Sequence, residues 1–417
     1  MTRSLRLSAL VLLLASPTMP GAIQSAARAQ VTAQAQPQMG YQTITSEQAP
    51  AWSRDSAREL LAYVEHIGQE GLDPADYNPD RLRAAIAGND DAALTQVATP
   101  IFIRLVQDLS GGAVRGRARV DWHMTDVTLD TAGQQRLLAQ VARGGGVGVA
   151  LDSLLPTHPQ YAGLKRALAN TPESDTARRD LIRTNMERWR WMPRTLGARH
   201  VLVNVPAFTA ALVDDGHVTT RHRAVVGAVR TPTPQLNAQI TAVTINPWWN
   251  VPQSIIQSQG GHFGAGYEVN RSASGGISVR QPPGPRNALG RVKIEMPNQW
   301  AIYLHDTPSQ ALFSRPARAF SHGCIRTQNV RDFAALLLAP TGGWDRADID
   351  RAVEAEDTRS VPLAHPIPVY IAYFTAAATS DGDIVTYSDV YSRDAPVRQA
   401  LNHLASAASQ QQASAAN

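Results

Sequence analysis

Cysteine is almost absent from this chain, because its 417 residues contain only one, Cys324. A single thiol cannot close an internal disulfide, so the fold must be stabilised by the burial of apolar side chains. A lone cysteine is usually a small buried hydrophobe. That interpretation explains poorly why Cys324 ends the run Ser321-His322-Gly323-Cys324, and why a second histidine, His305, lies nineteen positions before it. Cys324 is therefore a candidate reactive residue.

Long apolar runs are also missing. The stretch from Leu7 to Ala15 follows Arg3 and Arg6 and is too short to span a bilayer. With the small-residue site Ala27-Arg28-Ala29, this pattern predicts a cleavable signal peptide over residues 1–29, and an uncleaved N-terminal anchor is the alternative. Charge or proline interrupts every later apolar run. We therefore expect an exported mature protein without a transmembrane span.

A large net charge is missing as well. The formal charge is +4, and it falls to +1 once the three arginines of residues 1–29 are removed. Basicity therefore gives no argument for a nucleic-acid partner, and we expect none. Arginines are dense between Arg178 and Arg199, where they alternate with Met186, Trp189 and Trp191 at helical spacing. This pattern favours a solvated amphipathic helix face over a polyanion-binding site.

The first half of the chain has the patterns of a linker and of helices. Residues 30–50 are rich in Gln, Ala and Thr without periodicity and are expected to form a linker. Residues 51–192 place apolar side chains at helical spacing, which predicts a helical scaffold domain. Its last helix follows Thr171-Pro172-Glu173, where proline fits a first turn, and extends to Trp191.

After Pro193 the apolar residues recur with period two, which is typical of strands. Residues 199–376 are expected to form a mainly β domain, so the predicted fold class is α+β and multidomain. Residues 257–285, rich in Gly, Ser and Pro, are too long for a hairpin turn and are interpreted as a mobile loop or flap. A C-terminal extension over 377–404 and a disordered Ala/Ser/Gln-rich tail over 405–417 follow.

The chemistry expected of Cys324 requires a base. A thiol attacks as the thiolate, so its pKa of about 8.5 must be lowered or its proton removed near neutral pH. His305 is preferred because it ends a predicted strand and can be presented from a neighbouring strand, whereas His322 lies in a glycine-containing turn beside the thiol. His305 can be oriented by the side chain of Asp306 or by a backbone carbonyl of the turn at 306–308, and both alternatives stay open.

Two neighbours of Cys324 are candidates to contact a substrate. Gly323 permits close backbone approach, so the amides of Gly323 and Cys324 are expected to face a developing oxyanion. Arg326 is a candidate to bind a carboxylate, because guanidinium binds carboxylates through two parallel hydrogen bonds. The alternative for Arg326 is a surface ion pair with Asp332.

Metal and redox uses of the thiol have less support. A zinc site would have to combine Cys324, His322 and His305 without a second cysteine or a paired-histidine motif. A redox sensor would need a resolving thiol, and the chain contains no other cysteine. Cysteine catalysis needs no cofactor, so we expect neither a metal nor an organic cofactor.

At this motif the chain resembles the L,D-transpeptidases of the YkuD type, whose signature is a histidine followed after a spacer by Ser/Thr-His-Gly-Cys. Here the match reads HDTPSQALFSRPARAFSHGCIR over residues 305–326. Other segments resemble the large periplasmic YcbB-like subgroup: NMERWRWMP (185–193), VNVPAF (203–208), INPWWNVPQSI (245–255), QPPGPRNALGRVK (281–293) and YLHDTP (303–308). The inserted peptidoglycan-binding domain of many YcbB-like enzymes is missing, and residues 256–281 are short, which implies a more open cleft.

The resemblance implies a role for each residue of the motif. Cys324 is the nucleophile and His305 the general base and acid. Tyr303 looks like the family's site-lining tyrosine, with a core aromatic as the alternative, and Arg326 and His322 are substrate-binding candidates. Trp248 and Trp249 are expected to pack the sheet rather than touch the substrate.

The resemblance also implies a reaction in the periplasm. The thiolate attacks the meso-diaminopimelate carbonyl of a peptidoglycan tetrapeptide stem, releases D-alanine, and passes the acyl group to an amine of a second stem to form a 3-3 cross-link. Peptidoglycan stem peptides and carbapenem inhibitors are the expected partners, and other cell-wall synthases are candidates. Alternatives are a carboxypeptidase or hydrolase, a wall-lipoprotein ligase, or a non-catalytic wall-binding scaffold with the same fold.

Overall fold

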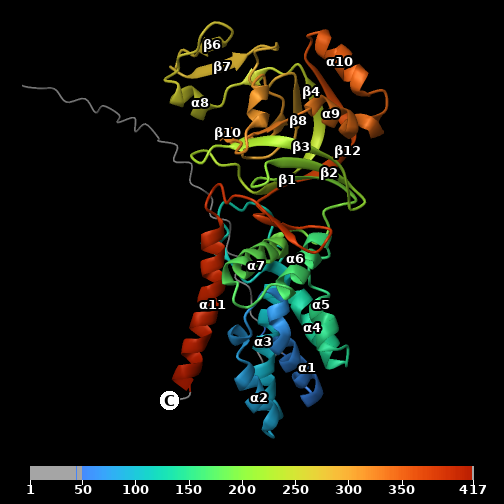
Figure 1. Ribbon diagram of the computed structural model, residues 1–417, viewed down its shortest axis with the longest axis vertical. Helices are drawn as coiled ribbons and strands as arrows, with labels where there is room; N and C mark the ends of the chain where they lie inside the picture. Colours follow the sequence, from blue (N-terminus) through green and yellow to red (C-terminus); the bar gives the residue numbers. More distant parts are fainter. Residues whose placement is uncertain (1–43, 45–48, 416–417) are drawn as a thin grey trace, which may run out of the picture. The chain divides into compact units, whose positions relative to one another are not determined.

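The computed structural model describes residue 44 and residues 49–415, with side chains described up to residue 404. The predicted signal peptide over 1–29 lies outside the described residues, and so does most of the predicted linker over 30–50. Within the described residues, no helix is both long enough and apolar enough to cross a bilayer. Figure 1 shows the elements of this part, coloured along the chain.

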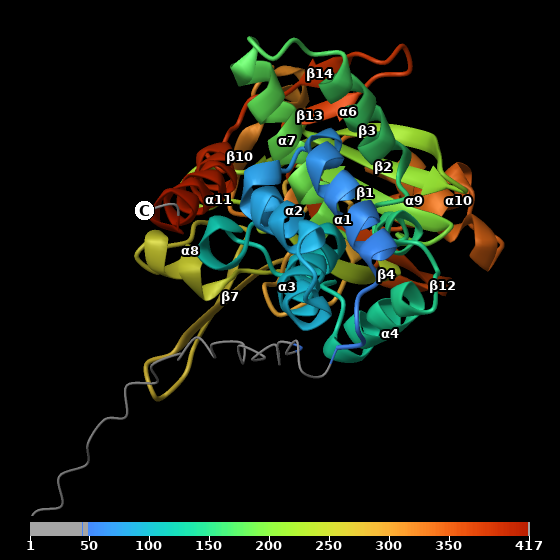
Figure 2. The ribbon, with the colours of Figure 1, turned by 90° about the horizontal axis from the view of Figure 1, so that it is seen from below.

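The first part of the described chain is helical, as predicted. Its helices are α1 (Arg54–His66), α2 (Pro79–Ala87), α3 (Asp91–Gly111), α4 (Thr131–Ala142), α5 (Val147–Asp152), α6 (Pro159–Ala169) and α7 (Thr176–Trp191). The carboxylate of Asp90 accepts hydrogen bonds from two amides in the first turn of α3 and so caps this helix. Helix α1 packs against α2 (Figure 2) and also against α5. Trp52 and Phe102 meet edge to face, with ring centroids 5.6 Å apart, within one apolar core.

Helix α7 corrects the expectation of a solvated arginine face. It begins at Thr176, after the Asp175 side chain caps it, and ends at Trp191. Arg190 and Glu187 are both fully buried, and the guanidinium Nη1 donates to the Glu187 carboxylate over 2.7 Å. Arg188 is also buried, so these arginines lie inside the protein because internal carboxylates replace water as their partners.

The second part is built on one nine-stranded sheet. Its strands are β1 (Arg199–Asn204), β2 (Thr209–Asp214), β3 (His217–Gly227), β4 (Leu236–Ile245), β8 (Val292–Glu295), β9 (Leu304–His305), β10 (Ala319–Ser321), β11 (Ile325–Thr327) and β12 (Arg359–Ala372). The strand order is β10-β3-β11-β9-β8-β4-β12-β1-β2, and β2 also pairs with β3, so eight strands form a closed ring to which β10 is added. This arrangement confirms the α+β fold class.

Two helices cover the apolar core of this sheet. They are α9 (Val330–Leu338) and α10 (Arg346–Glu354). Phe333 and Leu337 of α9 are buried in the same cluster as the inward side chains of β4, β8 and β12. Residues that face this core alternate along the strands with residues that face outward, which sets the geometry of the site described below.

Residues 249–281 form a small folded subdomain, which corrects the interpretation of 257–285 as a mobile loop. It contains β5 (Trp249–Asn250), α8 (Gln253–Ser258), β6 (Glu268–Arg271) and β7 (Ile277–Gln281), with strand order β5-β7-β6. Val251, Ile255, Ile256 and Val279 form its buried core. A few apolar side chains are therefore enough to order a segment whose composition is dominated by turn residues.

The chain returns to the helical part after β12. It forms the hairpin β13 (Ala376–Ala378) and β14 (Ile384–Thr386) and then helix α11 (Asp394–Ala415), which packs against α7. A Cβ atom on Gly163 of α6 would lie 2.4 Å from the Ala378 Cβ, so only glycine allows this close contact between helix and hairpin. The backbone of 405–415 is helical, where the composition predicts a disordered tail.

Candidate active site

The strand register brings Cys324 and His305 to one face of the sheet. Strands β9 and β11 are parallel neighbours, with Leu304 opposite Ile325 and His305 opposite Arg326. Leu304 and Ile325 are fully buried in the core. Because side chains alternate along a strand, His305 and Arg326 project to the opposite face. Tyr303 and Cys324, which precede Leu304 and Ile325, share that opposite face.

Strand β8 adds a lysine to this face. It pairs with the other side of β9 and places Lys293 opposite His305. Lys293, His305 and Arg326 therefore form a row across three neighbouring strands. The Lys293 ammonium lies 4.4 Å from the centroid of the Tyr303 ring and 2.7 Å from the Glu295 carboxylate. No sequence pattern indicated Lys293 beyond its place in the segment 281–293.

The Cys324 thiol is half-buried. Burial raises the pKa of this thiol, while interactions with the backbone and hydroxyl of Tyr303 and the charges of Lys293 and Arg326 oppose that rise. The sulfur lies 3.6 Å from the carbonyl oxygen of Ala301, to which the thiol donates. A base is therefore needed to generate the thiolate at neutral pH.

His305 has the properties of a neutral base. Its side chain is buried, and this burial, with the charge of Arg326 as the next cause, lowers the pKa of His305 to about 3. The backbone of Asp306 and Leu289 partly offsets the lowering of the pKa. The ring nitrogen Nδ1 is buried without a hydrogen-bond partner among the described residues. The imidazole can therefore accept a proton.

Tyr303 interacts with both the thiol and the imidazole. Its ring meets the His305 ring edge to face, with centroids 5.6 Å apart, and its hydroxyl interacts with Cys324. Burial, and then the charge of Cys324, raises the pKa of Tyr303 well above its usual value. Among the described residues, no hydrogen bond joins Cys324 directly to His305.

Asp306 does not orient His305 through its carboxylate. The Asp306 Oδ2 accepts a hydrogen bond of 2.9 Å from the Arg291 amide, and Oδ1 accepts one of 3.2 Å from the Gln310 side chain. Gly290, with φ of +65°, permits this packing, because a Cβ atom there would lie 2.4 Å from the Asp306 side chain. Of the two alternatives, the structure favours the backbone of Asp306 as the group near the ring.

The turn before Cys324 corrects the role expected of Gly323. Gly323 adopts φ of +115°, in the region that favours glycine. Its amide donates to the Ser321 hydroxyl over 3.1 Å, and this hydroxyl donates to the Cys324 carbonyl over 2.5 Å. The Gly323 amide is therefore engaged within the turn. The Cys324 amide donates no hydrogen bond within the described part of the chain, so it is the available oxyanion donor.

Arg326 and His322 differ in their placement. Arg326 is half-buried and its Nε has no hydrogen-bond partner among the described residues. Asp332, the alternative partner of Arg326, forms its ion pair with Arg346 instead. His322 is exposed, and within the described residues it has no hydrogen bond or ring contact that links it to Cys324. The structure thus groups Arg326, but not His322, with Cys324, Tyr303 and His305.

Trp249 reaches the site from the small subdomain, which sequence reasoning missed. Its indole interacts with the Tyr303 hydroxyl, and its ring meets Tyr267 at a centroid distance of 6.4 Å. Trp248 instead lies under the Arg280 guanidinium, 4.4 Å from the ring centroid. Trp249, and not Trp248, is therefore the tryptophan associated with the site.

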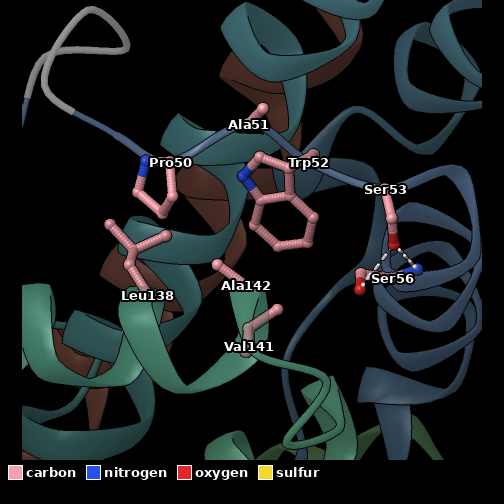
Figure 3. A pocket seen from close by; sticks show the side chains of 8 residues that line it. All are labelled: Pro50, Ala51, Trp52, Ser53, Ser56, Leu138, Val141 and Ala142. Carbon is pink, nitrogen blue, oxygen red and sulfur yellow. Dashed lines mark hydrogen bonds between the residues drawn. The ribbon is translucent and has the colours of Figure 1, made fainter.

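Enclosed space is found elsewhere in the protein. A cavity of about 50 Å³ in the helical part is lined by residues 50–53, Ser56, Leu138, Val141 and Ala142 (Figure 3). The Ser53 hydroxyl in its lining is already paired with Ser56. Among the described residues, no three His, Cys, Asp or Glu side chains gather as a metal-ligand set. This pocket contains no group that competes with the Cys324 face as a reactive site.

Two family models match the chain. Residues 198–362 match the model described as an L,D-transpeptidase catalytic domain (YkuD), and residues 41–168 match the scaffold domain model. A Haemophilus influenzae protein named "Putative L,D-transpeptidase" is 30% identical over 225 residues, which cover 48% of this chain and 45% of that relative. The matched part of the chain thus spans about half the length of this relative.

Solved L,D-transpeptidases show a weaker likeness. One from Mycobacterium smegmatis is 17% identical, with 42% of this chain and 58% of the other covered and a TM-score of 0.23. L,D-transpeptidase 3 from Mycobacterium tuberculosis is 14% identical, with 42% and 60% covered and a TM-score of 0.23. An LD transpeptidase solved in complex with imipenem is 15% identical, with 42% and 59% covered and a TM-score of 0.21.

Proposed function

We propose that this chain, which carries a scaffold domain followed by an L,D-transpeptidase catalytic domain of the YkuD type, cross-links peptidoglycan as a member of the YcbB-like subgroup. The observation that carries the proposal is the register of β9 and β11, which groups Cys324, Tyr303, His305 and Arg326 on one face. The substrate is a tetrapeptide stem, and the acceptor is the side-chain amine of a second stem.

The first half-reaction forms a thioester. His305 takes the thiol proton as the sulfur of Cys324 bonds to the meso-diaminopimelate carbonyl carbon, and the oxyanion that forms is met by the Cys324 amide. The hydroxyl of Tyr303 stabilises negative charge on the sulfur. The intermediate collapses with cleavage of the bond to D-alanine, whose amine receives the proton from His305.

The second half-reaction transfers the acyl group. His305, neutral again, takes a proton from the acceptor amine as that amine attacks the thioester. The carbon–sulfur bond breaks, the sulfur regains a proton, and a 3-3 cross-link is released. The low pKa of His305 means only that the ring is neutral when each nucleophile arrives.

Arg326 is proposed to bind a carboxylate of the stem. Its Nε has no partner among the described residues, and the nearby Asp332 is occupied by Arg346. A half-buried guanidinium with unused donors gains most from a planar acceptor that forms two hydrogen bonds. The small subdomain (residues 249–281) is proposed to contact the same stem, because the indole of its Trp249 interacts with Tyr303.

The location and the partners are part of the same proposal. The signal over residues 1–29 and the resemblance to periplasmic enzymes support export to the periplasm, with cell-wall synthases as neighbours. Carbapenems are proposed to acylate Cys324, which agrees with the imipenem complex of a similar enzyme.

Incubation with purified disaccharide tetrapeptide, followed by mass spectrometry, tests the reaction. A 3-3 dimer is expected from the wild-type protein and not from Cys324→Ala. Tripeptide alone would assign the acyl-enzyme to hydrolysis. Imipenem gives an independent arm, because an adduct on the wild-type protein that is absent from Cys324→Ala identifies the nucleophile. Failure to acylate would point to a non-catalytic wall-binding scaffold.

A further inference from the structure

The peptide unit between Gly323 and Cys324 is held from its carbonyl side. The Thr233 hydroxyl donates to the Gly323 carbonyl over 2.7 Å. In a planar trans peptide the carbonyl of one residue and the amide of the next point in opposite directions. Because Thr233 draws the Gly323 oxygen inward, the Cys324 amide is directed away from Thr233. This amide is the one that makes no hydrogen bond in the part of the chain that the structure describes.

Thr233 is itself held through each of its polar groups. It is fully buried, and its hydroxyl accepts from the Gly227 amide over 2.9 Å while donating to Gly323. Its amide donates to the Tyr391 hydroxyl over 3.2 Å, and its carbonyl accepts from the Arg393 guanidinium at 3.4 Å. A residue whose polar groups are all engaged in hydrogen bonds is held rigidly.

Tyr391 and Arg393 lie outside residues 198–362, the part that matches the catalytic domain. The Tyr391 hydroxyl donates to the Gly227 carbonyl over 2.6 Å, so it joins Gly227 and Thr233. Arg393 lies over the Tyr391 ring, 4.9 Å from its centroid, and forms a 2.6 Å ion pair with Asp121 of the helical part. Residues 377–404, the C-terminal segment, thus connect the helical part to the turn before the nucleophile.

We infer that Thr233 and Tyr391 are positioning residues that aim the Cys324 amide at the oxyanion of the acylation step. This inference rests on the proposed function, because it presumes that Cys324 is acylated. It assigns to the C-terminal segment a role in the reaction, since Tyr391 belongs to that segment and Arg393 anchors it to Asp121.

Two reagents separate this role from a general effect on the thiol. Imipenem acylation passes through a tetrahedral oxyanion, which the Cys324 amide is proposed to meet. Iodoacetamide alkylates the same sulfur at a saturated carbon and forms no oxyanion. The quantity measured is the ratio of the two second-order rate constants, followed by intact mass on protein purified as folded monodisperse material. Thermal unfolding of each variant is measured alongside.

Thr233→Val removes the hydroxyl with little change in shape, and we expect it to lower the ratio at least tenfold, since removal of an oxyanion donor costs about 10²-fold to 10³-fold in rate. Thr233→Ser, which restores a hydroxyl, should recover most of the ratio. Tyr391→Phe should lower it several-fold. Tyr387→Phe, in the same segment but with no hydrogen bond from its hydroxyl among the described residues, is the matched control.

The outcomes are distinct. A ratio within twofold of wild type in Thr233→Val overturns the inference, even if its melting temperature falls. If Thr233→Val does not fold, Tyr391→Phe decides by the same criterion. Absence of imipenem acylation in the wild-type protein would instead refute the proposed function.

Discussion

Tyr303 and Cys324 lie side by side immediately before β9 and β11, and the Tyr303 hydroxyl interacts with the Cys324 thiol. The Ile325 amide donates to the Tyr303 carbonyl over 3.0 Å, which fixes this pairing through the backbone. The pKa of the thiol is raised by burial, and Tyr303 is among the groups that oppose this rise. The tyrosine, and not the histidine, is thus among the groups that lower the pKa of the thiol.

Tyr303→Phe should raise the pKa of the Cys324 thiol and slow acylation. The lost hydrogen bond to a thiolate is worth about 1.5 to 3 kcal/mol, or roughly a tenfold to hundredfold change in thiolate population. The pH dependence of iodoacetamide alkylation measures the thiol pKa directly. A pKa equal to that of the wild-type protein would show that the hydroxyl does not stabilise the thiolate. Tyr387→Phe serves as the control.

His305→Ala should slow imipenem acylation by about 10²-fold to 10⁴-fold, because the thiol loses its proton acceptor. His322→Ala should change the rate by less than about threefold, since His322 is exposed and not grouped with the thiol. Both variants are compared by intact mass at fixed pH, with circular dichroism as a check of folding. The reverse order of effects would assign the base to His322.

Arg326→Gln should have two separable effects. The KM for the tetrapeptide stem should rise about tenfold or more as a charged partner of the carboxylate is lost. The positive charge of Arg326 also lowers the pKa of His305, so its removal should raise that pKa from about 3 and move the acid limb of kcat/KM to higher pH. A pH profile measured on imipenem and on the stem tests both. An unchanged KM with a shifted acid limb would reject the binding role and keep the electrostatic one.

The local parts of the site were predictable from the sequence, and the nonlocal parts were not. The motif around Cys324 and the preference for His305 need only short-range patterns. The neighbours Lys293 and Trp249 depend on which strands pair, and a two-residue strand such as β9 leaves no periodic signal. The role expected of Gly323 was wrong in part, because the Ser321 hydroxyl competes for its amide.

Composition misled at three segments for a shared physical reason. Residues 257–285 are rich in turn formers, yet a core of four buried apolar side chains orders the small subdomain there. The arginines of α7 were expected in water, but Arg190 is buried because Glu187 accompanies it. Residues 405–415 are helical where low complexity predicts disorder. In each case a contact or a continued helix outweighs the local preference.

Stability should fall with acid below pH 6.5, in part through His158. Its ring stacks on Trp189 at a centroid distance of 4.1 Å, and burial lowers the pKa of His158 to about 4. Above pH 6.5 the His158 ring is neutral in both the folded protein and the unfolded chain. Between 6.5 and 4 the unfolded chain binds a proton that the folded protein does not, so the free energy of unfolding falls by at most ~1.4 kcal/mol per pH unit from this group.

Urea unfolding at pH 7 and pH 5 measures this contribution. His158→Gln should reduce the difference between the two pH values, whereas the matched change His217→Gln, at an exposed histidine, should leave it unaltered. Equal pH dependence in the wild-type protein and His158→Gln would exclude His158 as a source of acid sensitivity.

Glu187 should be among the most sensitive positions for stability. Its carboxylate pairs with Arg190 at 2.7 Å and accepts from the Val114 amide at 2.7 Å and the Trp191 indole at 2.9 Å. Glu187→Leu keeps the volume but leaves the buried Arg190 charge and both donors unpaired, so the free energy of unfolding should fall by about 3 to 5 kcal/mol. Asp55→Asn, which breaks the exposed pair with Arg58, should cost less than about 1 kcal/mol. Urea denaturation of the wild-type protein, Glu187→Leu and Asp55→Asn measures these losses. If Glu187→Leu lost no more free energy of unfolding than Asp55→Asn, backbone carbonyls would have to compensate the Arg190 charge without Glu187.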